Sequence, residues 1–316
     1  MDTFAGRIAV VTGGGSGMGR ELVVQLAAAG CSVAACDLDL EAMESTLERA
    51  RAGAPEGVKV TAHGCDVSDE AAVNAFRDAV MAQHATDHVN LVFSNAGIGG
   101  GGSFVTGDRG QWDRTFDVCW GGVYNCARAF VPLLVASDAG HLVNTSSVNG
   151  FWAMLAPGVP HTAYSAAKFA VKGFSEALLE DFRLNAPHVQ VSVVMPGHIG
   201  TDIVTNSQKV HARNEPGHDP AAEVRATMAA RGVPTDGMSD DDLLNMMAMF
   251  GDMFRESAPM TAADAATAIL DGVLAGRWRL LIGDDAVELD EKVRADPEAA
   301  YGPDGPSIGN FGGVAS

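Results

Sequence analysis

The sequence predicts an α/β fold in which helices cover both faces of one doubly wound parallel sheet of about seven strands. Short, β-branched, wholly apolar runs recur along the chain, which is typical of strands buried on both faces. Longer segments of helical periodicity separate them. Apolar residues make up 47% of the 316 residues, enough for one large core.

The apolar runs and helical patterns alternate along the chain. The predicted strands are 8–11, 32–36, 58–62, 89–93, 142–145, 189–194 and 278–282. After the first helix, which ends before Gly30, the predicted helices are 40–52, 69–83, 111–136, 162–185 and 262–274. We interpret residues 1–285 as a single dinucleotide-binding and catalytic domain with a substrate-lid insertion at about 201–260, and residues 286–316 as a C-terminal tail.

Composition excludes several classes of function. The net charge of −19 argues against binding to nucleic acid or to an anionic membrane surface. No apolar run reaches the roughly 20 residues of a spanning helix, and the first strand begins too early to leave room for a signal peptide. Five scattered cysteines without a CxxC pair favour a reduced, cytoplasmic setting. His84 and His88 have metal-like spacing but lack further ligands, so we assign no metal.

The first strand leads into the glycine-rich segment Thr12-Gly13-Gly14-Gly15-Ser16-Gly17-Met18-Gly19, and a helix follows. Glycines allow a pyrophosphate to approach the backbone, and the helix N-terminus favours the anion. A glycine loop alone could be a simple turn, but its place between a strand and a helix favours cofactor binding.

Asp37 ends the second strand about 20 residues after the glycines, where an acid can accept hydrogen bonds from the adenosine ribose. It would also repel a 2′-phosphate, and the loop contains no Arg or Lys, so we expect NAD rather than NADP. The alternative is that Asp37 caps the helix 40–52. Asp66, after the third strand, either bonds the adenine edge or caps a turn.

Tyr164 and Lys168 are four residues apart and therefore share one face of the helix 162–185. A phenol has a pKa of about 10, and a nearby ammonium favours its ionised form. Neither Tyr124 nor Tyr301 has a Lys at this spacing. The pair is either a catalytic acid–base or a surface pair without a role.

Together these residues resemble the classical branch of the short-chain dehydrogenase/reductase family, whose sheet is of the Rossmann type. The matching residues are Thr12, Gly13, Gly17, Gly19, Asn95-Ala96-Gly97, Ser147, Tyr164, Lys168 and Pro196-Gly197, in the family's order. The resemblance covers roughly residues 5–285.

The resemblance implies that Tyr164 exchanges a proton with the substrate oxygen, that Lys168 lowers the pKa of Tyr164 and holds the nicotinamide ribose, and that Ser147 orients the substrate. The predicted cofactor-binding residues are Thr12, Gly13, Gly15, Ser16, Gly17, Met18, Gly19, Asp37, Asp66, Val67, Asn95, Ala96, Gly97, Tyr164, Lys168, Pro196, Gly197, Ile199 and Thr201. The predicted substrate-binding residues are Ser147, Tyr164, Phe151, Trp152 and His198.

The expected activity is NAD-dependent interconversion of a secondary alcohol and a ketone. Met and Phe residues near 246–254, in the insertion, are either core or a substrate lid; as a lid they favour a bulky apolar substrate such as a steroid, terpenoid or alicyclic alcohol. The alternatives are a ketoacyl-thioester reductase and a non-catalytic NAD-binding sensor.

One position departs from the family pattern, because Cys119 replaces an Asn that holds a relay water. Either proton exchange suffers, or the thiol is simply tolerated in packing. The family also implies a homotetramer or homodimer that pairs the helices 111–136 and 162–185.

Overall fold

The computed structural model describes residues 1–214, 219, 221–222, 224–225, 228 and 234–308. Its centre is a seven-stranded sheet with the order β11-β8-β5-β4-β1-β2-β3. Every pairing in this sheet is parallel. The strands are β1 (Ile8–Thr12), β2 (Ser32–Asp37), β3 (Val60–Gly64), β4 (Leu91–Ser94), β5 (Gly140–Thr145), β8 (Val189–Pro196) and β11 (Arg279–Ile282). The predicted fold class is confirmed.

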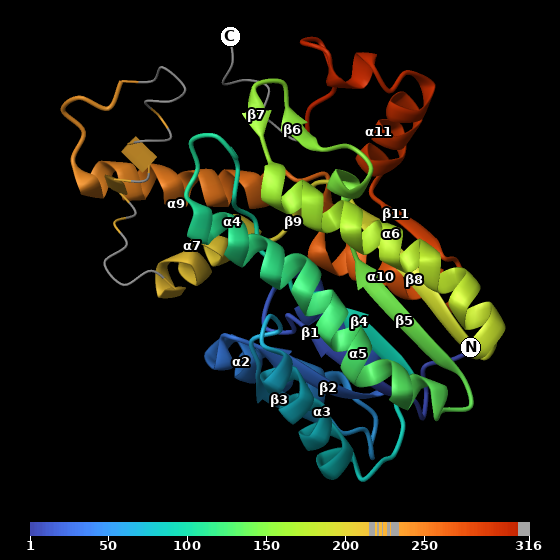
Figure 1. Ribbon diagram of the computed structural model, residues 1–316. Coiled ribbons are helices and arrows are strands. Elements are labelled where there is room, and N and C mark those ends of the chain that lie inside the picture. The colour runs from blue at the N-terminus through green and yellow to red at the C-terminus, as the bar shows by residue number, and fades with distance from the viewer. Residues whose placement is uncertain (215–218, 220, 223, 226–227, 229–233, 309–316) are drawn as a thin grey trace.

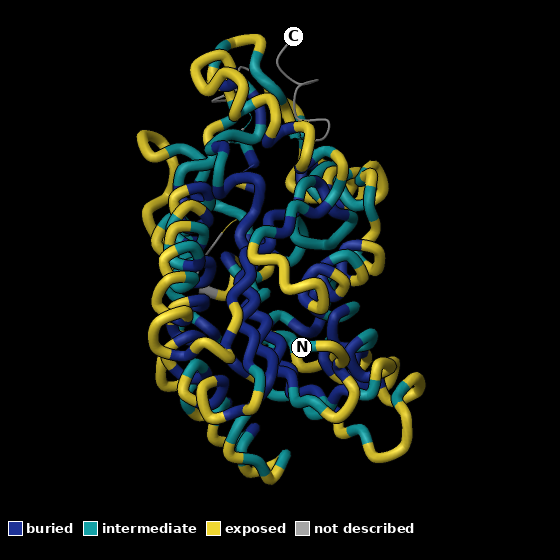
Figure 2. The backbone as a smooth tube through the Cα atoms, turned by 90° about the vertical axis from the view of Figure 1, so that its right-hand side faces the viewer, coloured by how far each residue is buried: buried dark blue, intermediate teal, exposed yellow. Residues whose placement is uncertain are grey.

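Helices cover the sheet on both faces (Figure 1). One face carries α1 (Gly17–Ala28), α2 (Leu40–Gly53) and α10 (Ala262–Leu274), and the other carries α3 (Glu70–His84), α5 (Gly122–Val135) and α6 (Thr162–Asn185). Within β1, Val11 packs on the first face and Val10 on the second. Strand residues alternate in this way, so both faces need apolar side chains. Figure 2 shows the buried strands between helices with exposed outer turns.

The strand order reverses at β1, which pairs with β2 on one side and β4 on the other. The chain after β1 turns to one face of the sheet and the chain after β4 to the other, which opens a crevice at their carboxyl ends. Ligand sites in doubly wound sheets lie at such a point, so the fold itself directs attention to the loops after β1, β2 and β4.

The predicted helix 111–136 is a longer, interrupted element. It consists of α4 (Arg109–Phe116), a π-helical turn at Asp117–Gly121 (η1) and α5. By length and composition Arg109–Val135 could span a membrane, yet 61% of its most apolar window is buried inside the protein. Its buried apolar residues pack against the sheet and α3.

Further elements lie beyond the carboxyl ends of the strands. The insertion contributes α7 (Ile203–Asn214) and α9 (Asp240–Glu256), and β9 (Ile199–Gly200) pairs with β10 (Met260–Thr261). A short hairpin, β6 (Met154–Ala156) with β7 (Val159–Pro160), follows the 3-10 turn η2 (Val148–Gly150).

The C-terminal part differs from the predicted tail. The expected boundary between residues 285 and 286 falls inside α11 (Asp284–Ala295), and the 3-10 turn η3 (Ala299–Tyr301) follows. Buried Leu289 and Ala300 pack against Val148 and Trp152, which gives this segment a core of its own. Residues 309–316 of the predicted tail lie outside the described residues, as does part of the insertion between 215 and 233.

Candidate active site

Two glycines between β1 and the first turn of α1 stand where a side chain would not fit. Gly13 has φ +67°, and a Cβ there would lie 2.9 Å from the Cα of Ala96. A Cβ on Gly19 would overlap the carbonyl oxygen of Gly13. The N-cap of α1, Ser16, makes no side-chain cap hydrogen bond, so the N–H groups of the first turn are available to an anion.

Thr12 joins this loop to the segment after β4. Its Oγ1 accepts hydrogen bonds from the N–H groups of Asn95 (3.0 Å) and Ala96 (3.1 Å), and Asn95 Nδ2 donates to the Thr12 carbonyl (3.2 Å). Thr12 is buried, and its hydroxyl is occupied by these hydrogen bonds. Thr12 thus positions the two loops on either side of the crevice.

Asp37 lies at the end of β2 beside the glycine loop. Its Oδ2 accepts from the N–H of Gly15 (2.9 Å) and its Oδ1 from the N–H of Asp39 (3.1 Å). The N-cap of α2 is Asp39, whose side chain accepts from Ala42, so the alternative role of Asp37 as that cap is wrong. The carboxylate of Asp37 is held at the edge of the crevice.

Four cations that sequence reasoning missed line the same space: Arg20, Lys209, Arg213 and Arg255. The Arg20 guanidinium, one residue past the loop, donates to the Gly15 carbonyl through Nε (3.1 Å) and Nη2 (2.6 Å). Lys209 and Arg213 are one turn apart on α7. Helix α7 lies over the glycine loop, where Asn206 Nδ2 donates to Ser16 Oγ (3.1 Å). Nothing in the local sequence of α7 predicts this position.

Asp66 is engaged by its own surroundings. Its carboxylate accepts from the N–H and hydroxyl of Ser68 (3.0 and 2.7 Å) and pairs with Arg114 (2.8 Å). Burial would raise the pKa of Asp66, but the hydrogen bonds from Arg114 and Ser68 outweigh it and lower the pKa. The turn-capping alternative therefore describes its carboxylate, although Asp66 and Val67 still line the crevice.

The crevice consists of two adjoining cavities. The glycine-loop cavity, of about 490 Å³, contains these predicted residues: Gly13, Gly15, Ser16, Gly17, Met18, Asp37, Asp66, Val67, Asn95, Ala96, Gly97 and Thr201. The tyrosine cavity, of about 650 Å³, contains these: Met18, Asn95, Gly97, Ser147, Tyr164, Lys168, Pro196, Gly197, His198, Ile199 and Thr201. Because Met18, Asn95, Gly97 and Thr201 line both, the two cavities meet. Thr12 and Gly19 line neither.

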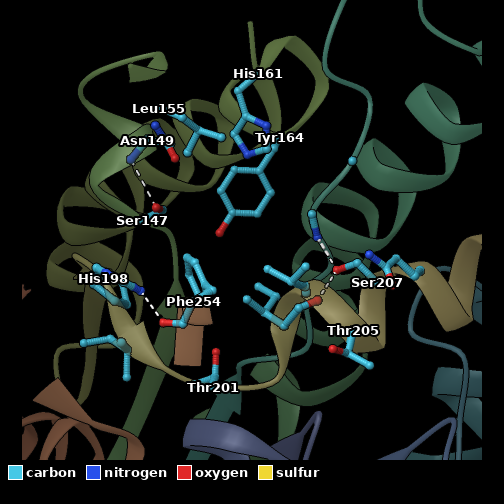
Figure 3. A pocket seen from close by; sticks show the side chains of 18 of the residues that line it. Ser147, Asn149, Leu155, His161, Tyr164, His198, Thr201, Thr205, Ser207 and Phe254 are labelled. Atoms are coloured by element: carbon cyan, nitrogen blue, oxygen red, sulfur yellow. Dashed lines mark hydrogen bonds between the residues drawn. The ribbon is translucent and has the colours of Figure 1, made fainter. Parts of the chain in front are cut away.

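Ser147, Tyr164 and Lys168 come together in the wall of the tyrosine cavity. Ser147 follows β5, and the other two lie one turn apart on α6. Lys168 is 2% exposed; its Nζ donates to the Thr145 carbonyl (2.8 Å) and lies 5.4 Å from the centre of the Tyr164 ring. Figure 3 shows the Tyr164 hydroxyl pointing into the cavity on the side of Ser147. The neighbouring Ser146 hydroxyl donates to the Lys168 carbonyl (2.7 Å), which supports the choice of Ser147.

The pKa of Tyr164 moves in the direction opposite to the expected one. Burial raises it, Cys119 raises it further, and a hydrogen bond with Ser147 only partly offsets this. Burial also lowers the pKa of Lys168. In the protein alone burial therefore keeps the Tyr164 phenol protonated at neutral pH.

The outer wall of the tyrosine cavity is mainly apolar and comes from segments that sequence analysis left unresolved. Its apolar side chains are Leu155, Ile203, Val204, Leu244, Met247, Phe250, Phe254 and Ile308, and α7 adds the polar side chains Thr205, Ser207, Gln208, Lys209 and His211. The Met/Phe stripe of α9 divides between the two alternatives: Met247 and Phe254 face the cavity, whereas Met249 is 71% exposed. His161 also lines the cavity, with its ring 4.7 Å from that of Tyr164, and burial lowers its pKa to about 4.

Phe151 and Trp152, predicted to bind substrate, do not line the cavity. Trp152 is fully buried and its Nε1 donates to the Ala300 carbonyl (2.9 Å), while Phe151 packs near the Arg279 guanidinium. Both turn toward the C-terminal segment because it offers them apolar partners. His198 does line the cavity, but its Nε2 is bonded to the Phe254 carbonyl (2.7 Å).

Cys119 lies on the π turn, fully buried, and its Sγ donates to the Ile98 carbonyl (3.2 Å). A Cβ on Gly97 would lie 3.4 Å from Lys168 Nζ and 3.7 Å from Cys119 Sγ, so the thiol is close to the ammonium. All five cysteines are free and buried, and the described residues contain no group of three potential metal ligands.

Comparisons with known proteins support the fold and identify the family. The family model for short chain dehydrogenases matches residues 7–212. The putative oxidoreductase SadH of Mycobacterium tuberculosis is 34% identical over 93% of this chain and 92% of its own. Epidermal retinol dehydrogenase 2 of Homo sapiens is 35% identical over 62% of each chain. A short-chain dehydrogenase/reductase from Burkholderia phymatum, solved in complex with NAD, superposes with a TM-score of 0.76 at 28% identity, covering 97% of this chain and 99% of that one. A metagenomic relative solved with NADP superposes at 0.54 with 25% identity, over 81% and 96%.

Proposed function

The chain belongs to the short-chain dehydrogenase/reductase family, and from that premise we propose that it is an NAD-dependent oxidoreductase that interconverts a secondary alcohol and a ketone. The observation that carries the proposal is the meeting of two cavities. One contains the glycine loop and Asp37, and the other contains Ser147, Tyr164 and Lys168. A dinucleotide that occupies the first can present its reactive ring at the second.

The residues of the glycine-loop cavity fit a dinucleotide. A Cβ at Gly13 or Gly15 would intrude on Ala96 or Asp37, so these positions are kept free of side chains. The first turn of α1, which has no side-chain cap, offers its backbone N–H groups to phosphate. When bound, a nicotinamide cofactor supplies or accepts a hydride. The Asp37 carboxylate supports NAD, because it would accept from ribose hydroxyls and repel a 2′-phosphate. The cations Arg20, Lys209, Arg213 and Arg255 are the opposing consideration, because they would attract a 2′-phosphate. Of these, Arg20 is engaged by the Gly15 carbonyl and Arg255 is paired with Asp202.

The proton is handled by the chain's own residues. Tyr164, which burial keeps protonated at neutral pH, donates its proton to the oxygen of a ketone and takes a proton back from an alcohol. Ser147 holds that oxygen through a hydrogen bond. Lys168, fixed by the Thr145 carbonyl, supplies a positive charge that favours the ionised tyrosine once the proton has left.

The apolar outer wall supports a bulky apolar substrate, such as a steroid, terpenoid or other alicyclic alcohol. Helix α9 and Ile308 contribute mainly apolar side chains to this wall, and α7 contributes Ile203 and Val204. The same helix also brings polar side chains to the cavity: Thr205, Ser207, Gln208, Lys209 and His211. The similarity to a protein named as a retinol dehydrogenase is consistent with this class of substrate.

The test is an assay of a series of alcohols and ketones with NAD and with NADP. We expect turnover of cyclic secondary alcohols with NAD, and better turnover of larger rings. Turnover restricted to ketoacyl thioesters with NADP would favour the fatty-acid-type reductase instead. NAD binding without turnover of any substrate would favour a sensor.

We also propose that the enzyme is cytoplasmic and forms a homodimer or homotetramer through the helices α5 and α6. Supporting this, Tyr124, Val135, Phe169 and Leu184 are large apolar residues of these helices that are 41–66% exposed in the single chain. The solution mass, measured by light scattering on a sizing column, tests the assembly.

A further inference from the structure

The C-terminal residues 284–308, here called the strap, lie outside the part of the chain matched by the family model. They nevertheless run between the two loops that flank the catalytic residues. At one end of the strap, Asp285 Oδ2 accepts from the N–H of His198 (2.6 Å) in the loop after β8. A Cβ on Gly197 would overlap the same carboxylate, so the loop and the strap are in close contact.

The other end of the strap is joined to the loop between Ser147 and Tyr164 by three hydrogen bonds. Trp152 Nε1 donates to the Ala300 carbonyl (2.9 Å), and the Ala153 N–H donates to the Tyr301 hydroxyl (2.9 Å). The Ile308 N–H donates to the Leu155 carbonyl (2.8 Å). Because Trp152 and Ala300 are both buried, the first of these bonds is shielded from water.

The last of these contacts brings a strap side chain into the active site. Ile308 and Leu155 both line the tyrosine cavity. Leu155 lies above the Tyr164 ring in Figure 3, on the side away from the hydroxyl, and both residues line the same cavity. Ile308 also packs against the buried cluster of Val148 and Trp152, which holds it in place from behind.

We propose that Ile308 is a substrate-specificity residue, which limits the size of the apolar body that can bind beside Tyr164. The inference rests on the proposed function and adds a residue to it. The strap is held at this point through the backbone N–H of Ile308, so the side chain is free to vary without loss of the hydrogen bond. The volume of that side chain then sets the width of the cavity between Leu155 and the side chains of α9.

The test measures binding of three secondary alcohols with one, two and four fused rings: cyclohexanol, 2-decalol and testosterone. Each is titrated into the enzyme saturated with tetrahydro-NADH, an analogue whose nicotinamide ring has no hydride to transfer. Neither the hydroxyl groups nor the 3-keto group of testosterone can then react, so the affinity is read without turnover. We expect Ile308→Trp to weaken testosterone binding at least about tenfold, the discrimination typical of a filled apolar pocket, and to change cyclohexanol binding less than about twofold.

Two further variants keep the outcome interpretable. Val287→Trp adds the same bulk at a 41% exposed position of α11 and should change none of the three affinities. Ile308→Ala removes wall surface without adding bulk, and should weaken testosterone alone, by about fivefold. NADH affinity should be unchanged throughout, which reports that the fold is intact.

Equal affinities for testosterone in the wild type, Ile308→Trp and Ile308→Ala would overturn the assignment of Ile308 and leave the proposed function standing. Size-dependent binding without oxidation of any of the three alcohols by NAD would support Ile308 and overturn the proposed function. If the wild type binds none of the three alcohols, both the specificity role of Ile308 and the proposal of a bulky apolar substrate are wrong.

Discussion

The glycine-loop cavity is formed largely by the loops after neighbouring strands, whereas the outer wall of the tyrosine cavity is assembled from four segments that lie far apart in the chain. In the first region, Asp37 is held by the Gly15 N–H and Thr12 by the loop after β4. In the second, Leu155, α7, α9 and Ile308 meet only because the strap and the insertion fold over the sheet.

This contrast separates two kinds of residue. Where backbone groups do the binding, each position is fixed by sterics and little can change without loss of the site. Where apolar side chains form a wall on a scaffold held elsewhere, volume can change while the fold persists. We therefore expect substitutions in the inner region to affect chemistry or cofactor choice, and substitutions in the outer region to affect stability or substrate size.

The largest effect should come from Tyr164→Phe, which removes the proton carried between substrate and protein. Turnover should fall by about a thousandfold or more, within the range of general acid–base catalysis. NADH affinity should stay near that of the wild type, since the ring remains. Steady-state kinetics and an NADH titration test this. Tyr124→Phe, at a 44% exposed tyrosine of α5, is the control and should be active. Substantial turnover by Tyr164→Phe would remove Tyr164 from the mechanism.

The next effect concerns the strap, which is anchored by a buried ion pair between Arg279 and Asp290 (2.6 Å). Arg279→Met should lower the free energy of unfolding by about 2 kcal/mol, less than for a fully broken buried pair because Arg294 still contacts Asp290. Arg294→Met is the control, because Arg294 is 64% exposed; it should cost below about 1 kcal/mol. Urea unfolding measures both.

The same pair predicts an acid dependence. Burial would raise the pKa of Asp290, but hydrogen bonds from Arg279 and Arg294 outweigh it and hold the pKa below its ordinary value. A carboxyl whose folded pKa is depressed stabilises the protein above its unfolded pKa of about 4, and this stabilisation is lost as the pH falls through the folded value. The difference between wild type and Arg279→Met should therefore be full at pH 7 and shrink below about pH 4. An equal difference at both pH values would contradict the ion-pair explanation.

The residues that the sequence could predict belong mainly to the inner region, and those that it could not are positioned by distant segments. Gly13, Asp37, Ser147 and the Tyr164–Lys168 pair were readable because each carries its chemistry in a local pattern. Trp152 was misplaced because nothing near it in sequence says that Ala300 will cover it. Lys209 and Arg213 were missed for the same reason, since their position over the glycine loop depends on how the insertion folds back. The raised pKa of Tyr164 depends on burial, which spacing alone does not give.

Asp37→Asn should produce a smaller, selective effect on the inner region. The substitution removes the charge and keeps an oxygen that can accept from Gly15, so the preference for NAD over NADP in kcat/KM should fall about tenfold, or about 1.4 kcal/mol. Asp39→Asn is a matched control: it removes the same charge two residues away, and Asn caps a helix as well as Asp does. If both variants shift the preference equally, the general field of the cavity and not the ribose contact is responsible. If the wild type already prefers NADP, the ribose argument fails.

The smallest effect is expected at Cys119, which belongs to the inner region by position but not by function. Its thiol donates to the Ile98 carbonyl within the core, and a carbonyl oxygen has a second lone pair that could still hold a water near Lys168. We therefore expect Cys119→Ser, a near-isosteric donor, to change kcat less than about threefold, because proton transfer at Tyr164 itself does not involve this position. Cys119→Asn, which introduces the family residue, should likewise leave kcat within that range while it loses some stability from the larger buried amide. The measurement is kcat against pH in both variants. A rise in kcat beyond about tenfold in Cys119→Asn would mean that the thiol slows proton exchange with solvent. Residue 119 would then take part in proton transfer as well as in packing.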